Sequence, residues 1–437
     1  MKNITIIGTG YVGLVTGAGM SEFGNRVICT DIDKNKIEKL NSGIIPIYEP
    51  GLEEIIKRNI SDNRLLFSSN VEDSIIQSEV VIIAVGTPMG VNSATDMSFV
   101  HSAVETISNN LNSYKVVCTK STVPIGTGKE IISQISKKVK DNNLFDYVSN
   151  PEFLREGSAV KDFLWPDRVV IGTDNQNAYQ IMCDIYRPLY INKNPMTQTS
   201  IETAEMIKYA SNSFLALKIS YINEIANLCE VLGADVHDVA NAMGKDGRIS
   251  EKFLHPGPGF GGSCFPKDLE ALLSISKNNN LSMETVNAAI IANKNQKKRM
   301  ANKLINLFDG NINNRKIAVL GLAFKANTDD VRESAAIDII KGILGNGGIV
   351  NAYDPIANNE MSKIFHDIEY FDNLYDAVKN VDGIVIITEW NEFRSLDLQK
   401  IKKIMKGNII LDTRNILDMD ELSSLGFVYD NIGRIKK

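Results

Sequence analysis

The sequence predicts an α/β protein in which two Rossmann-like doubly wound domains are joined by an all-helical central module with a long core helix. Three observations support this fold class. Short apolar strand patterns alternate with helical patterns in the first third of the chain, the alternation returns after residue 315, and one long helical pattern lies between them. We expect domains at residues 1–198, 199–300 and 301–437.

The first domain opens on a short apolar strand, Ile4–Ile7, which runs into the glycine turn Gly8–Gly13 and a helix rich in small residues. A second strand, Asn25–Asp31, ends in an acid. Continuous apolar runs predict the remaining strands, because both faces of a parallel sheet are buried. These strands are expected at 80–85, 115–120 and 146–149, with the last one closing the sheet.

The middle of the chain is one helical pattern from Thr199 to about Gly233, where glycine signals the end of the helix. Its apolar residues occupy more than one face, so neighbouring helices or a partner subunit must cover it, and we expect a homodimer. These residues are Met206, Tyr209, Phe214, Leu217, Tyr221, Ile225 and Leu228. The second α/β unit begins at Arg315, with a strand and turn at 316–325 and strands at 348–354, 383–388 and 408–412.

The N-terminal turn has the G-x-G-x-x-G pattern of a dinucleotide site, with glycines at 8, 10 and 13. In such a turn the glycines allow a tight bend, close approach to the pyrophosphate and close helix packing. Asp31 ends the next strand, could accept hydrogen bonds from the ribose hydroxyls and would repel a 2′-phosphate. The pattern favours NAD over NADP, and the alternative is a tight turn that binds no ligand.

Cys264 lies in a loop, His255–Asp268, that holds four glycines and three prolines. Such a loop approaches ligands closely and has a restricted shape, and the nearby Lys267 would favour a thiolate. Cys264 is therefore a candidate nucleophile, and the alternative is a small buried hydrophobic residue. The other cysteines lie in apolar runs and are expected in the core: Cys29, Cys118, Cys183 and Cys229.

Several polar residues occupy positions where a ligand could bind. Lys208 and Asn212 are spaced i, i+4 and share one face of the long helix, although a solvated stripe explains the same spacing. Glu152 and Glu156 follow a strand end, where they could act as base and substrate ligand or simply cap a helix start. Lys325 occupies the turn of the second unit and suits a phosphate, or is a surface lysine.

Composition narrows the class of protein. A net charge of −6 argues against a nucleic-acid binder, and no apolar run approaches the roughly 20 residues of a membrane span. The chain begins with a strand and not a signal peptide, and five cysteines without regular spacing indicate a reducing compartment, so we expect a cytoplasmic protein. No zinc-type His or Cys spacing is present, and no metal is expected.

With NAD, a thiol and no metal, two reactions stay open. A secondary alcohol could be oxidised once to a ketone with a lysine as base. Alternatively, an aldehyde could be oxidised to an acid through a thiohemiacetal and a thioester, and only this route needs the cysteine.

Taken together, these motifs resemble those of the UDP-glucose/GDP-mannose dehydrogenase family over essentially the whole chain. The resemblance implies that C6 of UDP-glucose is oxidised twice to UDP-glucuronate, a step toward polysaccharides, with two NAD and one water consumed. The motifs that carry it are Gly8–Gly13, Gly86-Thr87-Pro88, Lys120-Ser121-Thr122-Val123-Pro124, Asn150–Gly157, Gly259–Asp268, Phe324-Lys325 and Arg332-Glu333-Ser334.

The resemblance also implies roles for individual residues. The catalytic set would be Cys264 as nucleophile, Lys208 and Asn212 at the oxyanion, Asp268 and Thr122 at a water, and Glu152 in acid–base work. Cofactor-binding residues would be Gly8, Gly10, Tyr11, Val12, Gly13, Asp31, Lys36, Thr87, Pro88, Ser121, Thr122, Glu156, Lys267 and Arg332. Substrate-binding residues would be Glu152, Phe153, Leu154, Arg155, Glu156, Lys208, Asn212, Arg248, Phe253, Gly259, Phe260, Gly261, Phe324, Lys325 and Arg414, with Arg248 reaching a partner subunit's substrate.

Three other functions remain as alternatives. GDP-mannose is the second candidate substrate, since relatives that act on it share the thiol loop. A secondary-alcohol dehydrogenase would use the same Rossmann domain without needing Cys264. A non-enzymatic NAD sensor would bind NAD and turn over no nucleotide sugar.

Overall fold

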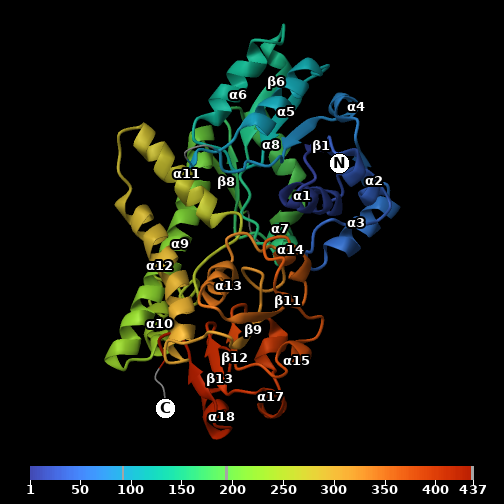
Figure 1. The fold of residues 1–437 in the computed structure, drawn as a ribbon. Coiled ribbons are helices and arrows are strands. Elements are labelled where there is room, and N and C mark those ends of the chain that lie inside the picture. The colour runs from blue at the N-terminus through green and yellow to red at the C-terminus, as the bar shows by residue number, and fades with distance from the viewer. Residues whose placement is uncertain (91–92, 192–194, 435–437) are drawn as a thin grey trace. The chain divides into compact units, whose positions relative to one another are not determined.

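The computed structural model describes residues 1–90, 93–191 and 195–434, and the chain divides into two compact units, 1–211 and 212–437. Figure 1 colours the first unit from blue to green and the second from green to red. Each unit is described by itself below. The three-domain division expected from the sequence remains a prediction.

Unit 1 is built on a sheet of eight described strands in the order β3-β2-β1-β4-β5-β6-β7-β8. Neighbouring strands are parallel except β6 and β7, which pair antiparallel. The strands are β1 (Asn3–Ile7), β2 (Arg26–Thr30), β3 (Leu65–Ser68), β4 (Val80–Ile83), β5 (Lys115–Thr119), β6 (Phe145–Ser149), β7 (Val169–Gly172) and β8 (Met196–Thr199).

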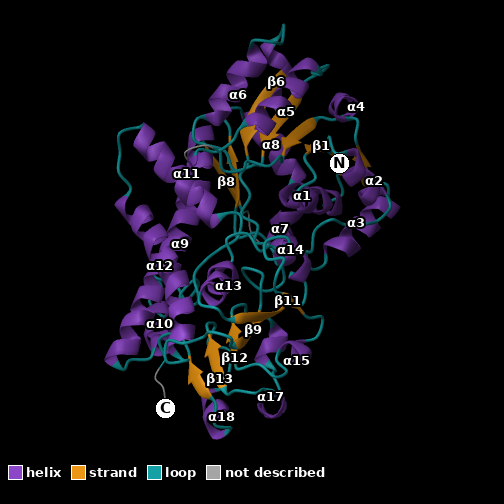
Figure 2. Cartoon of the chain, viewed as in Figure 1, coloured by secondary structure: helices purple, strands orange, loops and turns teal. Residues whose placement is uncertain are grey.

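Helices cover both faces of this sheet, as Figure 2 shows. Along β4, Val80 and Ile82 enter one apolar cluster, while Val81 and Ile83 enter another on the opposite face. This alternation explains why the strand reads as a continuous apolar run. The helices are α1 (Tyr11–Glu22), α2 (Lys34–Asn41), α3 (Leu52–Ser61), α4 (Val71–Gln77), α5 (Ser98–Asn109), α6 (Thr127–Ser136), α7 (Ala159–Leu164) and α8 (Gln176–Ile185).

The predicted strands are confirmed, but the prediction that residues 146–149 close the sheet is wrong. Beyond β6 the sheet continues through β7 and β8. β7 is a buried apolar run as short as β4 and was overlooked, whereas β8, Met196–Thr199, carries mostly polar residues because it is an edge strand with exposed side chains. Such a strand lacks the apolar run that identifies a central one.

The long helix α9 (Ile201–Leu232) confirms the central helical pattern, and Gly233 follows it with a φ of 72°. This positive φ is the conformation that glycine adopts readily at a helix end. In unit 2, α9 is followed by α10 (Val236–Gly244), α11 (Phe265–Asn278) and α12 (Glu284–Asn306). Side-chain hydrogen bonds tie α9 to α12, including Ser220 to the carbonyl of Ala289 at 2.8 Å.

The remainder of unit 2 is a second parallel sheet, in the order β11-β10-β9-β12-β13-β14 among the described strands. Its strands are β9 (Lys316–Leu320), β10 (Ile349–Tyr353), β11 (Glu369–Tyr370), β12 (Gly383–Ile386), β13 (Ile409–Asp412) and β14 (Val428–Asp430). Its helices are α13 (Ala335–Gly345), α14 (Asn358–Ser362), α15 (Leu374–Ala377), α16 (Asn391–Arg394), α17 (Leu398–Ile404) and α18 (Met419–Ser424). The predicted fold class, two doubly wound sheets with a helical region between them in sequence, is confirmed. No helix in the described part of the chain is long and apolar enough to cross a membrane.

Candidate active site

The glycine turn at the end of β1 has the shape that a dinucleotide needs. Gly8 has a φ of 104°, and a Cβ on Gly13 would lie 1.9 Å from the carbonyl oxygen of Gly8. These two glycines therefore allow the tight turn and the close packing of α1. A Cβ on Gly10 would have no atom within 4 Å, so open space lies over the turn. This open backbone fits a pyrophosphate, which would approach the N-terminus of α1.

Asp31 lies beside this turn at the end of β2. Its Oδ2 accepts hydrogen bonds from the backbone N–H and hydroxyl of Thr9, at 2.9 and 2.7 Å, and from Lys36 Nζ at 3.2 Å. Burial acts to raise the pKa of Asp31, but the hydrogen bonds from Thr9 and Asp33 and the charge of Lys36 lower it on balance. The carboxylate is thus held ionised and partly exposed, as a ribose ligand must be.

The second Rossmann-like turn, in unit 2, differs in the exposure of its acid. The equivalent acid at the end of β10, Asp354, is buried and accepts the backbone N–H groups of Leu322 and Ala323 at 2.7 and 3.1 Å. Trp390 Nε1 donates to the same oxygen at 3.1 Å. Asp31 also bonds to the protein but stays partly exposed, whereas Asp354 is 2% exposed, so the acid of this second turn is not accessible to a ribose.

Tyr11 connects the glycine turn to the loop that carries Glu156. Its hydroxyl donates to Glu49, and burial, followed by this contact, raises the pKa of Tyr11. Glu49 also accepts the backbone N–H groups of Gly157 and Ala159, at 2.6 and 2.7 Å. Sequence reasoning missed Glu49, because the residues that it joins are 38 to 110 positions away.

The loops after β4 and β5 place Thr87, Pro88, Ser121 and Thr122 at one edge of the sheet, where ligands of such folds bind. Ser121 Oγ donates to the carbonyl of Val85 at 2.7 Å. This bond ties the two loops together.

Lys120, at the start of the second of these loops, is buried; the sequence placed it in a motif at a strand end but assigned it no role of its own. Its Nζ donates to Asn150 Oδ1 at 3.1 Å and to the Tyr186 hydroxyl at 3.3 Å, and burial lowers the pKa of Lys120 to about 8. Asn150 precedes Glu152 by two residues, so this network fixes the start of the predicted substrate loop.

Glu152 and Lys208 form a buried ion pair. Lys208 Nζ lies 2.9 Å from Glu152 Oε1, and the two side chains are 4% and 6% exposed. Glu152 Oε2 also accepts the backbone N–H of Leu154. The alternatives in which Lys208 is solvated and Glu152 caps a helix are wrong, since both are buried and the next helix begins at Ala159. A buried pair of this kind is costly to desolvate, which points to a functional reason for keeping it.

The ring of Phe153 lies between two cations. Arg168 Cζ is 3.8 Å from the ring centroid, and Lys208 Nζ is 5.5 Å away. Arg168 was not among the sequence candidates. The exposed Arg155 instead forms an ion pair with Asp162 at 2.6 Å, which fixes the loop.

The Cys264 loop in unit 2 is packed closely against the second sheet's turn. A Cβ on Gly262 would lie 2.7 Å from the ring of Phe324, and one on Gly261 would lie 2.3 Å from the carbonyl oxygen of Glu333. The backbone N–H of Gly262 donates to the carbonyl of Arg332 at 2.8 Å. The loop glycines are therefore required by contact with Phe324, a predicted substrate residue.

Cys264 itself occupies the N-cap position of α11, where a helix stabilises negative charge. It is partly exposed, and Ser263 Oγ lies 3.6 Å from its Sγ. The other four cysteines are buried as expected, and burial raises the pKa of both Cys29 and Cys118 to about 12. Only Cys264 among the five has the exposure that a nucleophile needs.

Asp268 lies one turn into α11 and is almost fully buried. Its two carboxylate oxygens accept Asn212 Nδ2 at 2.6 Å and Lys267 Nζ at 2.8 Å. Asn212 is likewise buried, so its solvated alternative is wrong. Unit 2 thus brings Asn212, Lys267 and Asp268 together. Lys267, predicted to bind cofactor, already pairs with Asp268.

Aromatic rings and one amide shape the rest of the loop. Phe265 stacks its edge against Phe260, with centroids 5.9 Å apart, and Phe253 lies 6.4 Å from Phe265. Asn293 of α12 accepts the N–H of Phe260 at 2.7 Å and donates to its carbonyl at 3.0 Å. A Cβ on Gly259, whose φ is 115°, would lie 2.8 Å from the Asn293 oxygen.

The predicted basic ligands of unit 2 occupy different settings. Arg414 donates to the carbonyls of Ile387 and Phe324, at 2.7 and 3.1 Å, beside the Cys264 loop at Gly257. Lys325 Nζ lies 5.2 Å from the ring of Phe324. Two others lie at the surface: Arg332 pairs with Asp330, and Arg248 pairs with Asp246 while its side chain is 90% exposed.

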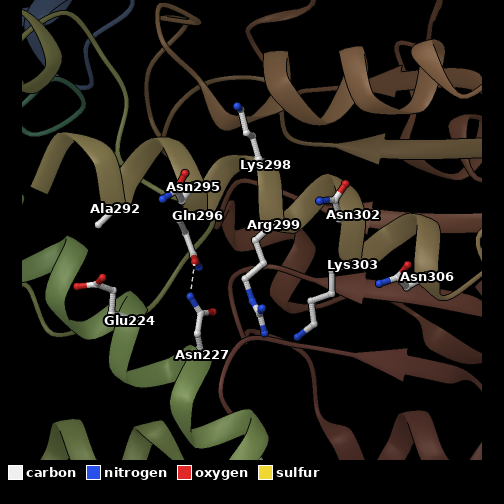
Figure 3. Close-up of a pocket in the computed structure, with 10 residues that line it drawn as sticks. All are labelled: Glu224, Asn227, Ala292, Asn295, Gln296, Lys298, Arg299, Asn302, Lys303 and Asn306. Carbon is white, nitrogen blue, oxygen red and sulfur yellow. Dashed lines mark hydrogen bonds between the residues drawn. The ribbon is translucent and has the colours of Figure 1, made fainter. Parts of the chain in front are cut away.

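A groove of about 600 Å³ between α9 and α12 is not part of this site (Figure 3). Its cations Arg299 and Lys303 both pair with Glu230, at 2.6 Å each. None of its lining residues is a predicted site residue. Among the residues that the structure describes, no group of three or more His, Cys, Asp or Glu could hold a metal ion.

Comparison with known proteins identifies relatives over the whole chain. Three models of the UDP-glucose/GDP-mannose dehydrogenase family match: the NAD binding domain over residues 2–190, the central domain over 202–295 and the UDP binding domain over 318–419. Residues 2–190 are therefore an NAD-binding domain, and NAD is the cofactor.

Individual relatives agree with these matches. The UDP-glucose 6-dehydrogenases of Bacillus subtilis and Rhizobium meliloti are 47% and 46% identical to the chain, each over 99% of its length and over 94% and 99% of their own. The solved structure of a UDP-glucose dehydrogenase from Pyrobaculum islandicum has a TM-score of 0.91 at 34% identity and covers 99% of the chain and 98% of that protein.

Proposed function

The chain belongs to the UDP-glucose/GDP-mannose dehydrogenase family, and we propose that it oxidises the C6 hydroxymethyl of UDP-glucose twice to give UDP-glucuronate. It is an NAD-dependent nucleotide-sugar dehydrogenase. The single observation that carries the twofold reaction is Cys264, a partly exposed thiol at a helix N-terminus on a glycine-lined loop. One oxidation of an alcohol would not need it.

In the dinucleotide site, the backbone at Gly10 would hold the pyrophosphate and Asp31 the ribose. When bound, NAD supplies the acceptor for the hydrides that leave C6. The protein's own task is to orient the sugar and to hold the proton and charge that remain.

The thiol carries the second half of the reaction. The first oxidation removes one hydride and one proton from C6 and leaves an aldehyde. The Cys264 sulfur then bonds to C6 as a thiohemiacetal, whose oxidation to a thioester removes the second hydride and proton. Water breaks the C–S bond, gives the carboxylate, and returns the thiol. The net change is one alcohol, one water and two NAD converted to one carboxylate, two NADH and three protons.

The ionic groups of the site suit the charge that develops at C6. We assign Lys208 and Asn212 to the C6 oxyanion, where preorganised donors stabilise negative charge. Glu152, paired with Lys208, would exchange protons with that lysine and with water. Asp268 and Thr122 would orient the hydrolytic water. The carboxylate of Asp268 is already held in one orientation by two hydrogen bonds.

Binding of the nucleotide is assigned to the second sheet's turn and the loops that contact it. Lys325 and Arg414 would hold the diphosphate, with Phe324 and the Cys264-loop glycines beside the sugar. The match of residues 318–419 to a UDP binding domain supports this assignment. It also favours UDP-glucose over GDP-mannose, as do the names of the relatives.

We also propose a homodimer formed through α9. On this helix, apolar side chains spaced seven residues apart are exposed, with Phe214 at 60% and Leu228 at 54% and Tyr221 between them. A stripe of this spacing on one helix face is what a second helix would cover. The exposed Arg248 pairs with Asp246 in one copy of the chain. In the dimer we expect it to extend toward the second copy.

The test is an incubation of the purified protein with NAD and a panel of UDP-glucose, GDP-mannose and UDP-N-acetylglucosamine, followed by NADH absorbance. We expect turnover to be fastest with UDP-glucose. Faster turnover with GDP-mannose would reassign the substrate, and NAD binding with no turnover of any sugar nucleotide would contradict the enzyme assignment.

A further inference from the structure

We propose that Glu205 is a positioning residue for this reaction, because its carboxylate fastens the loop that carries Thr122 to the helix that carries Lys208. The inference rests on the proposed function, from which Thr122 and Lys208 take their roles. Glu205 belongs to none of the motifs found in the sequence. It lies on α9 in unit 1 and is 2% exposed.

The carboxylate of Glu205 bridges two backbone groups at the start of α6. Its Oε2 accepts the N–H of Gly126 at 2.6 Å, and its Oε1 accepts the N–H of Gly128 at 2.8 Å. These N–H groups lie at a helix N-terminus, where they have no partner within the helix. Glu205 therefore supplies from another element the cap that α6 does not provide for itself.

Helices α6 and α9 are packed too closely at this contact to shift along each other. A Cβ on Gly128 would lie 2.3 Å from Ile201 and 2.6 Å from the ring of Tyr147. The backbone of α6 thus meets α9 directly at this point. A carboxylate that holds such a contact sets the position of α6 along α9.

The same bond fixes one end of the Thr122 loop. The other end is held by the sheet, since the N–H groups of Lys120 and Ser121 donate to the carbonyl of Ile83 at 2.9 and 3.2 Å. Residues 122–125 span the distance between these two anchors. If the Glu205 anchor is released, the loop keeps its strand end, the buried Val123 and the bonds from Thr127 to the carbonyl of Pro124, but it loses its tie to α9.

Spacing along α9 connects the anchor to the reactive groups. Lys208 follows Glu205 by three residues and Asn212 follows by seven, so all three share one helix face. All three side chains are buried. Glu205 consequently holds the position of Thr122 relative to the helix face that bears Lys208. Catalytic groups misplaced by about 1 Å lose on the order of 100-fold in rate.

The charge of Glu205 is sensitive to pH near neutrality. Burial raises its pKa from the ordinary 4.5 to about 7, although the N–H groups of Gly126 and Gly128 act to lower it. Glu202 of α9 raises it further and Lys129 of α6 lowers it, and the Tyr147 hydroxyl of β6 also faces this carboxylate. On protonation, one oxygen becomes an O–H that no longer accepts well, so the anchor weakens below about pH 7.

Stability changes with pH in the opposite sense. Because the folded pKa of Glu205 lies above its unfolded value, the folded protein binds this proton more tightly. Its contribution to stability is fully present below about pH 4.5 and is lost as the pH rises toward 7. Above pH 7 the folded protein therefore keeps Glu205 ionised and lacks this contribution to its stability. A contact with a purely structural role would not require the charge.

The experiment compares wild type with Glu205→Gln and the matched control Glu202→Gln. Glu202 lies one turn earlier on α9 and pairs with Lys129 of the same α6 start. The kcat and KM for UDP-glucose are measured from pH 6 to 8.5, together with amide hydrogen exchange at residues 126–128 without substrate. We expect Glu205→Gln to lower kcat about 10- to 100-fold at pH 8, with KM within about twofold, and to abolish the fall in kcat below pH 7.

The control should keep the wild-type kcat at pH 8 and show its acid limb at a lower pH than wild type, because the charge of Glu202 helps to raise the pKa of Glu205. Glu205→Asp, which keeps the charge, should retain the acid limb with a smaller loss of kcat. The protection factors at 126–128, which correct for the intrinsic pH dependence of amide exchange, should fall in Glu205→Gln and become independent of pH. A Glu205→Gln profile equal to wild type would overturn the inference. If wild type does not oxidise UDP-glucose, the proposed function fails, and unchanged exchange at 126–128 would separately refute the anchor.

Discussion

Replacing Lys208 with methionine tests whether the Glu152–Lys208 pair is both buried and functional. The variant keeps the length and most of the volume of the side chain but leaves the Glu152 carboxylate with the Leu154 N–H. Breaking a buried pair in this way costs about 3–5 kcal/mol, because one charge is left uncompensated. Removing both charges, in Glu152→Gln with Lys208→Met, should recover most of that loss.

The loss in the free energy of unfolding is measured by urea unfolding at pH 7.5, monitored by circular dichroism. The two single variants and the double variant form a double-mutant cycle. Lys57→Met is the control, since Lys57 pairs with Glu53 at the surface of the same unit and should cost less than about 1 kcal/mol. The activity should behave differently from the stability. Both Lys208→Met and the double variant should lose about 100- to 1000-fold in kcat, because the oxyanion donor is missing. A loss of stability below about 1 kcal/mol, or a double variant as active as wild type, would refute the reasoning.

Other predictions concern the cofactor turn, the thiol and the helix stripe. Gly10→Ala, whose Cβ meets nothing within 4 Å, should keep the wild-type melting temperature yet weaken NAD binding by at least about tenfold in calorimetry, whereas equal affinity would contradict the pyrophosphate assignment. Gly13→Ala should instead destabilise the fold, because its Cβ would lie 1.9 Å from the Gly8 oxygen, and a melting temperature equal to wild type would argue against this packing. Cys264→Ser should abolish formation of UDP-glucuronate in product analysis, and normal turnover would favour a single-step dehydrogenase. Leu228→Glu should convert the proposed dimer to monomer in light scattering, and a variant that stays dimeric would place the interface elsewhere.

Much of the fold could be predicted because it depends on local patterns. The continuous apolar run of β4 indicates a buried strand, and the glycine after α9 indicates a helix end. Each signal lies within a few residues of sequence. The two strands beyond β6 were not expected: β8 is polar and lies at the sheet edge, and the short run of β7 was overlooked although it is as buried as β4. Sheet order is a property of contacts that no window of sequence contains.

The site residues show the same contrast between local patterns and long-range contacts. Contiguous motifs could be predicted, because their residue types indicate their chemistry. They are the glycine turn with Asp31 and the Cys264 loop. Glu49 and Glu205 were missed because each is an isolated acid whose partners are backbone N–H groups far along the chain. A backbone N–H has no sequence signature, so only the folded chain shows which carboxylate it binds.

The measurement that tests the central claim most directly is the number of NADH formed per UDP-glucose consumed when the reaction has run to completion. Oxidation through a thioester on Cys264 predicts two NADH for each sugar nucleotide, with UDP-glucuronate as the product. A ratio of one would show that the reaction stops at the first oxidation and would contradict the role assigned to the thiol.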